Sequence, residues 1–82
     1  MPKNNPSNLR VVEIEHLPIE LYKLLKFENL VQSGGEAKLM ISEGHVRVNG
    51  EVETRKAKKL FAGDIVTFAK QKLQIAQTQE KT

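Results

Sequence analysis

The tightest local constraint on this fold is the dipeptide Asn49-Gly50, which separates two short stretches rich in valine. A type I′ turn needs a positive φ at both of its central positions, and asparagine followed by glycine adopts that geometry readily. We therefore predict a β-hairpin with strands over residues 45–48 and 51–53. The side chains expected to face the interior are Val46, Val48 and Val52.

Apolar and polar residues also alternate elsewhere in the chain. In residues 10–15, Val12 and Ile14 alternate with Glu13 and Glu15, which predicts a strand with one apolar face. Near the C-terminus, the turn signal Ala62-Gly63-Asp64 precedes two more short apolar stretches on either side of residues 70–72. The apolar residues of these two predicted strands are Ile65, Val66, Phe68, Leu73 and Ile75.

A first helix is predicted to begin at Pro18 and to end near Glu28. Proline suits the first turn of a helix because its missing N–H would have no partner there. Asn29 is expected to stop the helix because asparagine tolerates the left-handed conformation. The apolar residues that recur at helical spacing are Leu17, Leu21, Leu24 and Leu25, with Tyr22 beside them.

A second helix is predicted from the sequence Ser33-Gly34-Gly35-Glu36, which has the form of a capping box. In that motif the serine oxygen accepts from the third helical amide, and the glutamate accepts from the amide of the cap residue. A phosphate-binding role for the two glycines is the alternative, but Glu36 in the first turn would repel an anion. Gly44 is expected to terminate this helix. Its buried residues are expected to be Ala37, Met40 and Ile41, with Leu39 at their edge.

These elements predict an α+β fold in which two helices pack on a small, mainly antiparallel sheet. We expect one domain over residues 9–76, with disordered tails over 1–8 and 77–82. The whole chain has 82 residues, enough for one modest core but not for a deep cleft between lobes, so we do not expect an enzyme. The sequence has no cysteine and no apolar segment of membrane-spanning length. We therefore expect a monomeric cytoplasmic protein without a membrane partner.

Positive charge is concentrated in the second half of the sequence. Residues 1–37 carry four Lys or Arg against five acids, whereas residues 38–72 carry eight against four, and the whole chain has a formal net charge of +3. Such a balance indicates a polyanionic partner. The function that we consider first is therefore binding to nucleic acid.

The densest positive charge follows the predicted hairpin, where four of five consecutive residues are cations and none is an acid. Neutralising a phosphate releases condensed counterions, so a cluster of cations favours binding to nucleic acid. The alternative is that these charged residues form an ordinary solvent-exposed face and bind no ligand. Lys38 of the second helix and Arg47 of the adjoining strand join the run if that helix packs beside the hairpin. The candidate binding residues are Lys38, Arg47, Arg55, Lys56, Lys58 and Lys59.

Other chemistry finds little support in the sequence. His16 and His45 lie 29 positions apart without acids at ligand spacing, so we expect no metal, no cofactor and no catalytic residue. We expect the acids Glu43, Glu51, Glu53 and Asp64 to serve solubility and ion pairing, since nothing in the sequence places two of them in one cleft.

The chain contains four aromatic residues: Tyr22, Phe27, Phe61 and Phe68. Three of them belong to apolar patterns and are expected in the core, and only Phe61 is a candidate for stacking on a base. Recognition should therefore depend on the backbone and shape of a folded nucleic acid.

Three sequence motifs occur in an order and spacing that resemble a known family. They are Leu-Val-Gln-Ser-Gly-Gly-Glu-Ala-Lys at 30–38, Gly-His-Val-Arg-Val-Asn-Gly at 44–50 and Gly-Asp-Ile-Val at 63–66. The sequence resembles the RNA-binding domain named after the small-subunit ribosomal protein S-four, and within it the short stand-alone bacterial YbcJ-like proteins. This resemblance implies a helix-turn-helix called the alpha-L motif, packed on the sheet. It also implies binding to structured RNA through the second helix and the adjoining hairpin.

The resemblance makes RNA the preferred polyanion, with ribosomal RNA or a tRNA-like element as the expected targets in ribosome or translation-related work. Many family members carry an arginine directly after the serine that opens the second helix, where this sequence has Gly34. Lys38 and the run over 55–59 would then carry more of the binding. The alternative function is a protein-interaction adaptor whose basic face meets an acidic partner.

Overall fold

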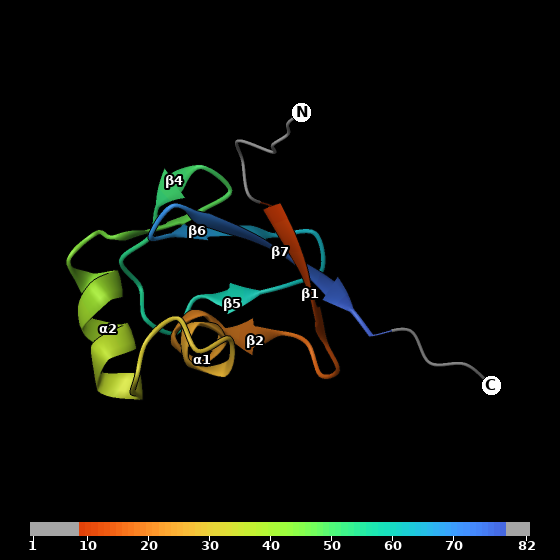
Figure 1. The fold of residues 1–82 in the computed structure, drawn as a ribbon, viewed down its shortest axis with the longest axis horizontal. Helices are drawn as coiled ribbons and strands as arrows, with labels where there is room; N and C mark the ends of the chain where they lie inside the picture. Colours follow the sequence, from red (N-terminus) through yellow and green to blue (C-terminus); the bar gives the residue numbers. More distant parts are fainter. Residues whose placement is uncertain (1–8, 79–82) are drawn as a thin grey trace, which may run out of the picture.

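Five strands form one mixed sheet in the order β1-β7-β6-β3-β4 in the computed structural model, which describes residues 9–78 (Figure 1). Every neighbouring pair runs antiparallel except β1 and β7, which are parallel. The mainly antiparallel sheet predicted from the sequence is therefore confirmed. Its strands are β1 (Leu9–Ile14), β3 (Val46–Val48), β4 (Glu51–Val52), β6 (Ile65–Phe68) and β7 (Gln71–Gln77).

β3 and β4 form the predicted hairpin. Asn49 and Gly50 have φ values of 53° and 88°, the left-handed conformation that a type I′ turn requires at both positions. Val46 and Val48 are buried as predicted, but Val52 is 50% exposed, so its predicted inward orientation is wrong. Val52 lies opposite Arg47 in the strand register, and residues directly opposite in an antiparallel pair share a face. Val52 therefore follows Arg47 to the outer face of the sheet.

The first and last strands lie side by side. Val12 and Ile14 are buried, which confirms the apolar face predicted for the first strand, and Val12 pairs with Ile75 of β7. β7 continues to Gln77, one residue past the predicted domain boundary at 76. Residues 1–8 and 79–82 of the predicted tails lie outside the described residues.

A two-stranded ribbon, which the sequence did not predict, lies below the sheet in Figure 1. It consists of β2 (Ile19–Glu20) and β5 (Lys59–Leu60), which pair antiparallel. Strands of two residues are too short to show a period in the sequence. The ribbon nevertheless contributes Leu60, which is fully buried, to the core.

The first helix, α1 (Leu21–Phe27), begins later than predicted. Pro18 follows a cis peptide bond and precedes β2, because residues 19–20 pair with β5 instead of entering a helix. Leu21, Leu24 and Leu25 are fully buried, as their spacing predicted. Asn29 has a φ of 59° and follows the end of the helix, as expected.

The last residue of α1, Phe27, is 61% exposed, so its predicted place in the core is wrong. Phe27 lies three residues after Leu24 and two after Leu25, both buried. Each helical position adds about 100° of rotation, so Phe27 lies about 60° from Leu24 but about 160° from Leu25, beyond the edge of the buried face.

The second helix, α2 (Gly34–Ser42), begins at the predicted cap. The amide of Glu36 donates to Ser33 Oγ at 3.1 Å. The other half of the predicted capping box differs, because the Glu36 carboxylate accepts from the amide of Gln32 at 2.8 Å and not from that of Ser33. Ala37 and Ile41 are buried as predicted, and Met40 is half-buried.

The second helix ends as predicted, at Gly44. This glycine follows α2 with a φ of 85°, a conformation that strains any residue with a side chain.

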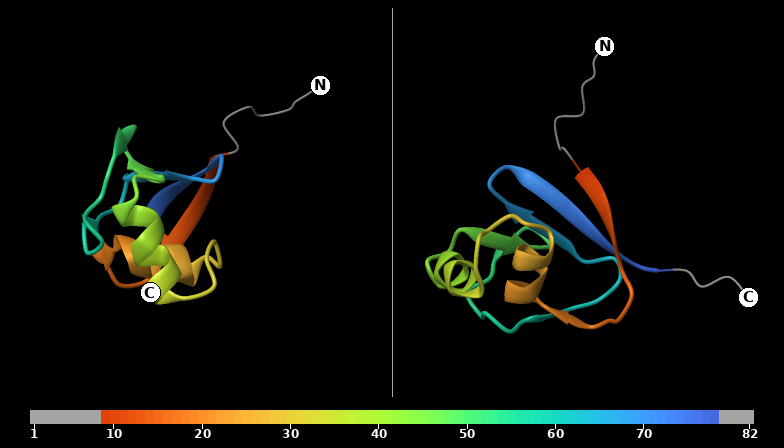
Figure 2. Two further views of the ribbon diagram at one scale, coloured as in Figure 1. Left: turned by 90° about the vertical axis from the view of Figure 1, so that its left-hand side faces the viewer. Right: turned by 60° about the horizontal axis from the view of Figure 1, so that its bottom comes forward.

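One core joins these layers, and Figure 2 shows both helices on the same side of the sheet. The inward side chains of the sheet pack against α1, α2 and the β2–β5 ribbon. No helix within residues 9–78 is long and apolar enough to cross a membrane. The two helices and small sheet predicted from the sequence are thus the observed architecture.

The ribbon should prove part of the core when Leu60 is shortened. Leu60→Ala removes a fully buried side chain, and such truncations cost about 2–5 kcal/mol of unfolding free energy. Leu39→Ala is the matched control, because Leu39 is an exposed leucine on α2 and its loss should cost less than about 0.5 kcal/mol. Urea unfolding measures both values. Equal losses would show that the ribbon does not belong to the core.

Candidate functional site

The basic segment over residues 55–59 connects β4 to β5 and is bonded to the start of α1. The amide of Leu21 donates to the Lys58 carbonyl at 2.9 Å, and the amide of Tyr22 donates to the Lys56 carbonyl at 3.1 Å. Glu20, the N-cap residue, makes no side-chain cap of its own. The carbonyls of the basic segment therefore replace a helix cap, which fixes the backbone that carries these cations.

Lys38 reaches the same place from α2. Its Nζ lies 4.7 Å from the centre of the Tyr22 ring, a cation–π contact. Because the amide of Tyr22 is bonded to Lys56, this tyrosine joins α2 to the basic segment. These two contacts place Lys38 of α2 near the start of α1, to which the basic segment is bonded.

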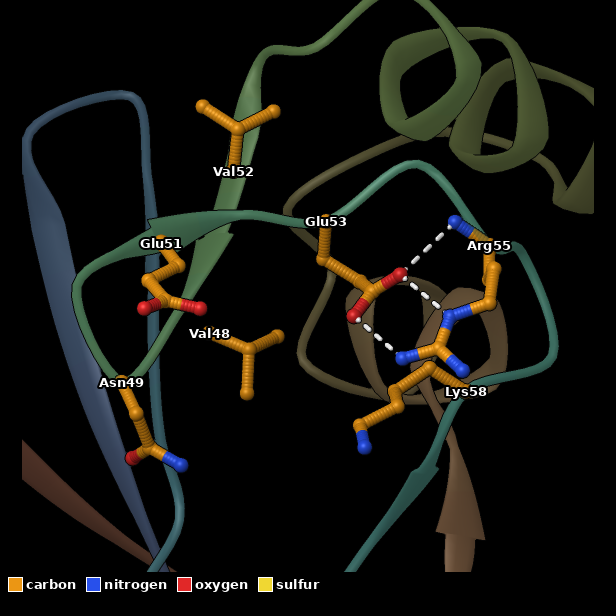
Figure 3. Close-up of a pocket in the computed structure, with 7 residues that line it drawn as sticks. All are labelled: Val48, Asn49, Glu51, Val52, Glu53, Arg55 and Lys58. Carbon is orange, nitrogen blue, oxygen red and sulfur yellow. Dashed lines mark hydrogen bonds and ion pairs between the residues drawn. The ribbon is translucent and has the colours of Figure 1, made fainter.

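Arg55 is held by an acid that the sequence analysis did not link to the run. Its Nε and Nη2 donate to the two carboxylate oxygens of Glu53 at 2.9 and 3.1 Å, and its amide donates to the same carboxylate at 3.0 Å (Figure 3). The hydrogen bonds from the Arg55 side chain and amide lower the pKa of Glu53 from 4.5 to about 2, and the charge of Lys58 adds to the effect. Glu53 therefore offsets part of the charge of the predicted run.

A surface pocket of about 320 Å³ lies beside this ion pair. Two of its lining residues are cations, Arg55 and Lys58, and two are acids, Glu51 and Glu53. Nothing in the sequence indicated that these two acids line one pocket, whereas the ion pairing expected of Glu53 is observed. Glu53 is nevertheless unsuited to proton transfer near neutral pH, because its pKa is lowered and its carboxylate is occupied by Arg55.

A second pocket, of about 400 Å³, also borders the segment and shares Arg55 and Lys58 with the first. Its lining contains three cations and no acid: Arg55, Lys58 and Lys59, with Ala57 and Phe61. Lys59 pairs through the backbone with Glu20, but the Glu20 carboxylate lies 3.2 Å from Lys23. Within residues 9–78, Lys59 has no ion pair, so its charge is available to a ligand.

Arg47 lines neither of these two pockets. It projects from the outer face of β3, and its Nη1 donates to the Gly50 carbonyl at 3.1 Å. Arg47 and Lys72 line one pocket of about 470 Å³. Thr67 of β6 lies between them, because it pairs with Arg47 of β3 on one side and with Lys72 of β7 on the other. Lys72 was not predicted as a companion of Arg47. The pairing of β6 with β7 would have revealed it, had the register been known.

The two histidines form no catalytic or metal-binding arrangement within the described part of the chain. His16 is exposed, and Nε2 of His45 lies 3.6 Å from the Glu43 carboxylate. No group of three or more His, Cys, Asp or Glu residues within 9–78 is arranged to hold a metal ion.

Comparison with protein families matches residues 12–76 to the S4 domain. A curated protein of Escherichia coli strain K12, named "Putative RNA-binding protein YbcJ", is 48% identical over 61 residues, which cover 74% of this chain and 87% of that protein. The "Probable ribosome maturation protein RlbA" of Bacillus subtilis strain 168 is 42% identical over 55 residues, covering 67% of this chain and 78% of that protein.

Among solved structures, the solution structure of YbcJ from Escherichia coli matches with a TM-score of 0.62 and 38% identity. The match covers 93% of this chain and 95% of that one, and the description of that structure reports a motif involved in RNA binding. The likeness therefore extends over sequence and fold together.

The lowered pKa of Glu53 should appear in the pH dependence of stability. A carboxylate whose pKa falls on folding stabilises the protein above its ordinary pKa, here 4.5, and this contribution is lost as the pH falls toward about 2. Glu53→Gln should therefore flatten the decline of unfolding free energy over that interval, as measured by urea unfolding at several pH values. Glu51→Gln is the control, because Glu51 has no ion pair within residues 9–78. Identical curves for wild type and Glu53→Gln would contradict the role of this ion pair.

Proposed function

The chain belongs to the S4 domain family, and on this premise we propose that it binds structured RNA without catalysing a reaction. The proposed binding site, the basic surface, surrounds the start of α1. The observation that carries this proposal is the attachment of the basic segment to the start of α1, where Tyr22 also contacts Lys38 of α2. The residues of the basic surface are Lys38, Arg55, Lys56, Lys58 and Lys59.

The chemistry of these side chains favours a phosphate backbone as the ligand. Lysine supplies a mobile point charge that tolerates many phosphate geometries, whereas Arg55 already has two guanidinium nitrogens bonded to Glu53. Base-specific readout through this surface alone would need fixed bidentate donors. We therefore propose that the basic surface recognises the shape and charge of folded RNA.

Ribosomal RNA or a tRNA-like element is the proposed target, in work related to ribosomes or translation. The name of the Bacillus subtilis relative, which refers to ribosome maturation, supports this choice. On this proposal the protein acts in the cytoplasm, where such RNA is assembled and used.

Arg47 is proposed as a separate phosphate contact on the outer face of the sheet. Its pocket also contains Lys72, so two cations are available there. Because one guanidinium nitrogen is bonded to Gly50, the side chain is held in place before RNA arrives. RNA that follows the β3–β4 hairpin would meet this pair after leaving the basic surface.

RNA affinity should depend steeply on salt concentration. If about four of the cations meet phosphates, the logarithm of affinity should fall with the logarithm of salt at a slope of roughly −3 to −4. Replacing Lys56, Lys58 and Lys59 together by glutamine should weaken binding and flatten this slope by about two to three units. Thermal unfolding should change little, because exposed charges contribute little to stability.

The matched control replaces Arg10, Lys26 and Lys70 by glutamine, which removes the same net charge from other parts of the surface. This control should retain most of the affinity and the slope, as measured by fluorescence anisotropy with ribosomal RNA fragments. A wild-type slope near zero, or equal losses in both triple variants, would refute a localised basic surface.

Crosslinking in cells separates RNA binding from the adaptor function. We expect ultraviolet crosslinking followed by sequencing to recover ribosomal RNA or tRNA with the wild-type protein, and far less with the Lys56, Lys58 and Lys59 variant. We also expect co-purifying proteins to be released by RNase. Acidic proteins that remain bound after RNase, with no crosslinked RNA, would favour the adaptor.

A further inference from the structure

Phe61 is a large apolar side chain on the surface of a protein that buries most of its others. It directly follows Leu60, which is fully buried, yet Phe61 is 54% exposed. Removing its ring from water would stabilise the protein, so its exposure gives the folded chain no energetic benefit. An exposed aromatic beside a cluster of cations is a candidate contact for a ligand.

The backbone around Phe61 is firmly held. The amide of Phe61 donates to the Asp64 carboxylate at 2.9 Å, and the amide of Asp64 donates to the Phe61 carbonyl at 3.1 Å. The same carboxylate accepts from the Asn49 side chain at 3.1 Å, which ties this turn to the β3–β4 hairpin. Gly63 in turn donates to the Ile75 carbonyl at 2.7 Å. The aromatic ring therefore projects from a turn that would not need to be ordered on binding.

Phe61 lines the pocket of about 400 Å³ that contains only cations among its charged residues. This volume lies within the range of roughly 300–1,000 Å³ that is usual for small-molecule sites. Arg55, Lys58 and Lys59 contribute the charge, and Ala57 leaves room beside the ring. The pocket thus combines an aromatic face with several phosphate-binding groups.

We propose that this pocket binds an unpaired nucleotide of the RNA ligand. The nucleobase stacks on the Phe61 ring, and the adjoining phosphates lie against Lys58 and Lys59. This inference rests on the proposed RNA-binding function and adds to it a requirement for an unstacked base. Stacking on an aromatic side chain tolerates every base, because each base has a π face.

A nucleotide fits this pocket better than an apolar protein side chain. An apolar partner on Phe61 would take Lys58 and Lys59 out of water without supplying an anion, and unpaired charges are costly to desolvate. A nucleotide carries an aromatic face and an anion on one short covalent framework. The combination of residues in the pocket matches that pair of groups.

The test compares two RNA probes, a hairpin with an adenine-rich loop and a blunt-ended duplex of the same stem sequence. Phe61→Ala should lower affinity for the hairpin by roughly 5- to 100-fold, the effect usual for a lost stacking contact, and leave affinity for the duplex unchanged. Phe61→Trp should retain hairpin affinity because tryptophan also stacks. A fluorescent adenine analogue in the loop should be quenched by the wild type but not by Phe61→Ala.

Phe27→Ala is the matched control, since Phe27 is also an exposed phenylalanine but does not line this pocket. It should change neither affinity, and thermal unfolding should show that both alanine variants remain folded. If Phe61→Ala binds both probes like the wild type, or loses affinity for both equally, the stacking site is refuted while RNA binding stands. If the wild type binds neither probe nor ribosomal RNA fragments, the proposed function itself fails.

Discussion

Both the fold and the basic surface depend on the hydrogen bonds that the first amides of α1 donate to the basic segment. The first amide groups of a helix need acceptors from outside the helix, and here no side chain provides them. The carbonyls of Lys58 and Lys56 accept from Leu21 and Tyr22 instead, so the basic segment cannot move away without leaving amide donors unpaired. Because Leu21 is fully buried, this bond also connects the segment to the core. The segment that carries the positive charge is therefore also a segment that stabilises the domain.

Turn and cap chemistry was the most predictable part of the fold. Asn49-Gly50, Ser33 and Gly44 each act through a local backbone preference, and the structure confirms all three. The helix start predicted at Pro18 is wrong because the fixed φ of proline suits both a first helical turn and the approach to a short strand. The deciding factor, pairing of residues 19–20 with 59–60, lies about forty positions away in the sequence and leaves no local pattern.

The candidate site was predictable in composition but not in arrangement. The sequence identified the run over 55–59 and Lys38, yet it could not reveal that Glu53 folds back onto Arg55. That contact depends on how the chain turns after β4. Phe27 shows the same limit, since its apolar character predicted burial and only the packed structure shows that its ring is exposed. Charge counting therefore finds the surface, while backbone geometry decides which charges are available.

The parallel pairing of β1 with β7 determines when the sheet can form during synthesis of the chain. Leu9 pairs with Lys72 and Ile14 with Gln77, so the first strand has its sheet partner only at the far end of the sequence. During synthesis from the N-terminus, Val12 and Ile14 leave the ribosome long before Leu73 and Ile75 exist to cover them. Contacts of such long sequence separation also form slowly, because much of the chain must be ordered first. The domain thus reaches its native sheet only after nearly all of it has been translated, and until then its first strand is an exposed apolar segment.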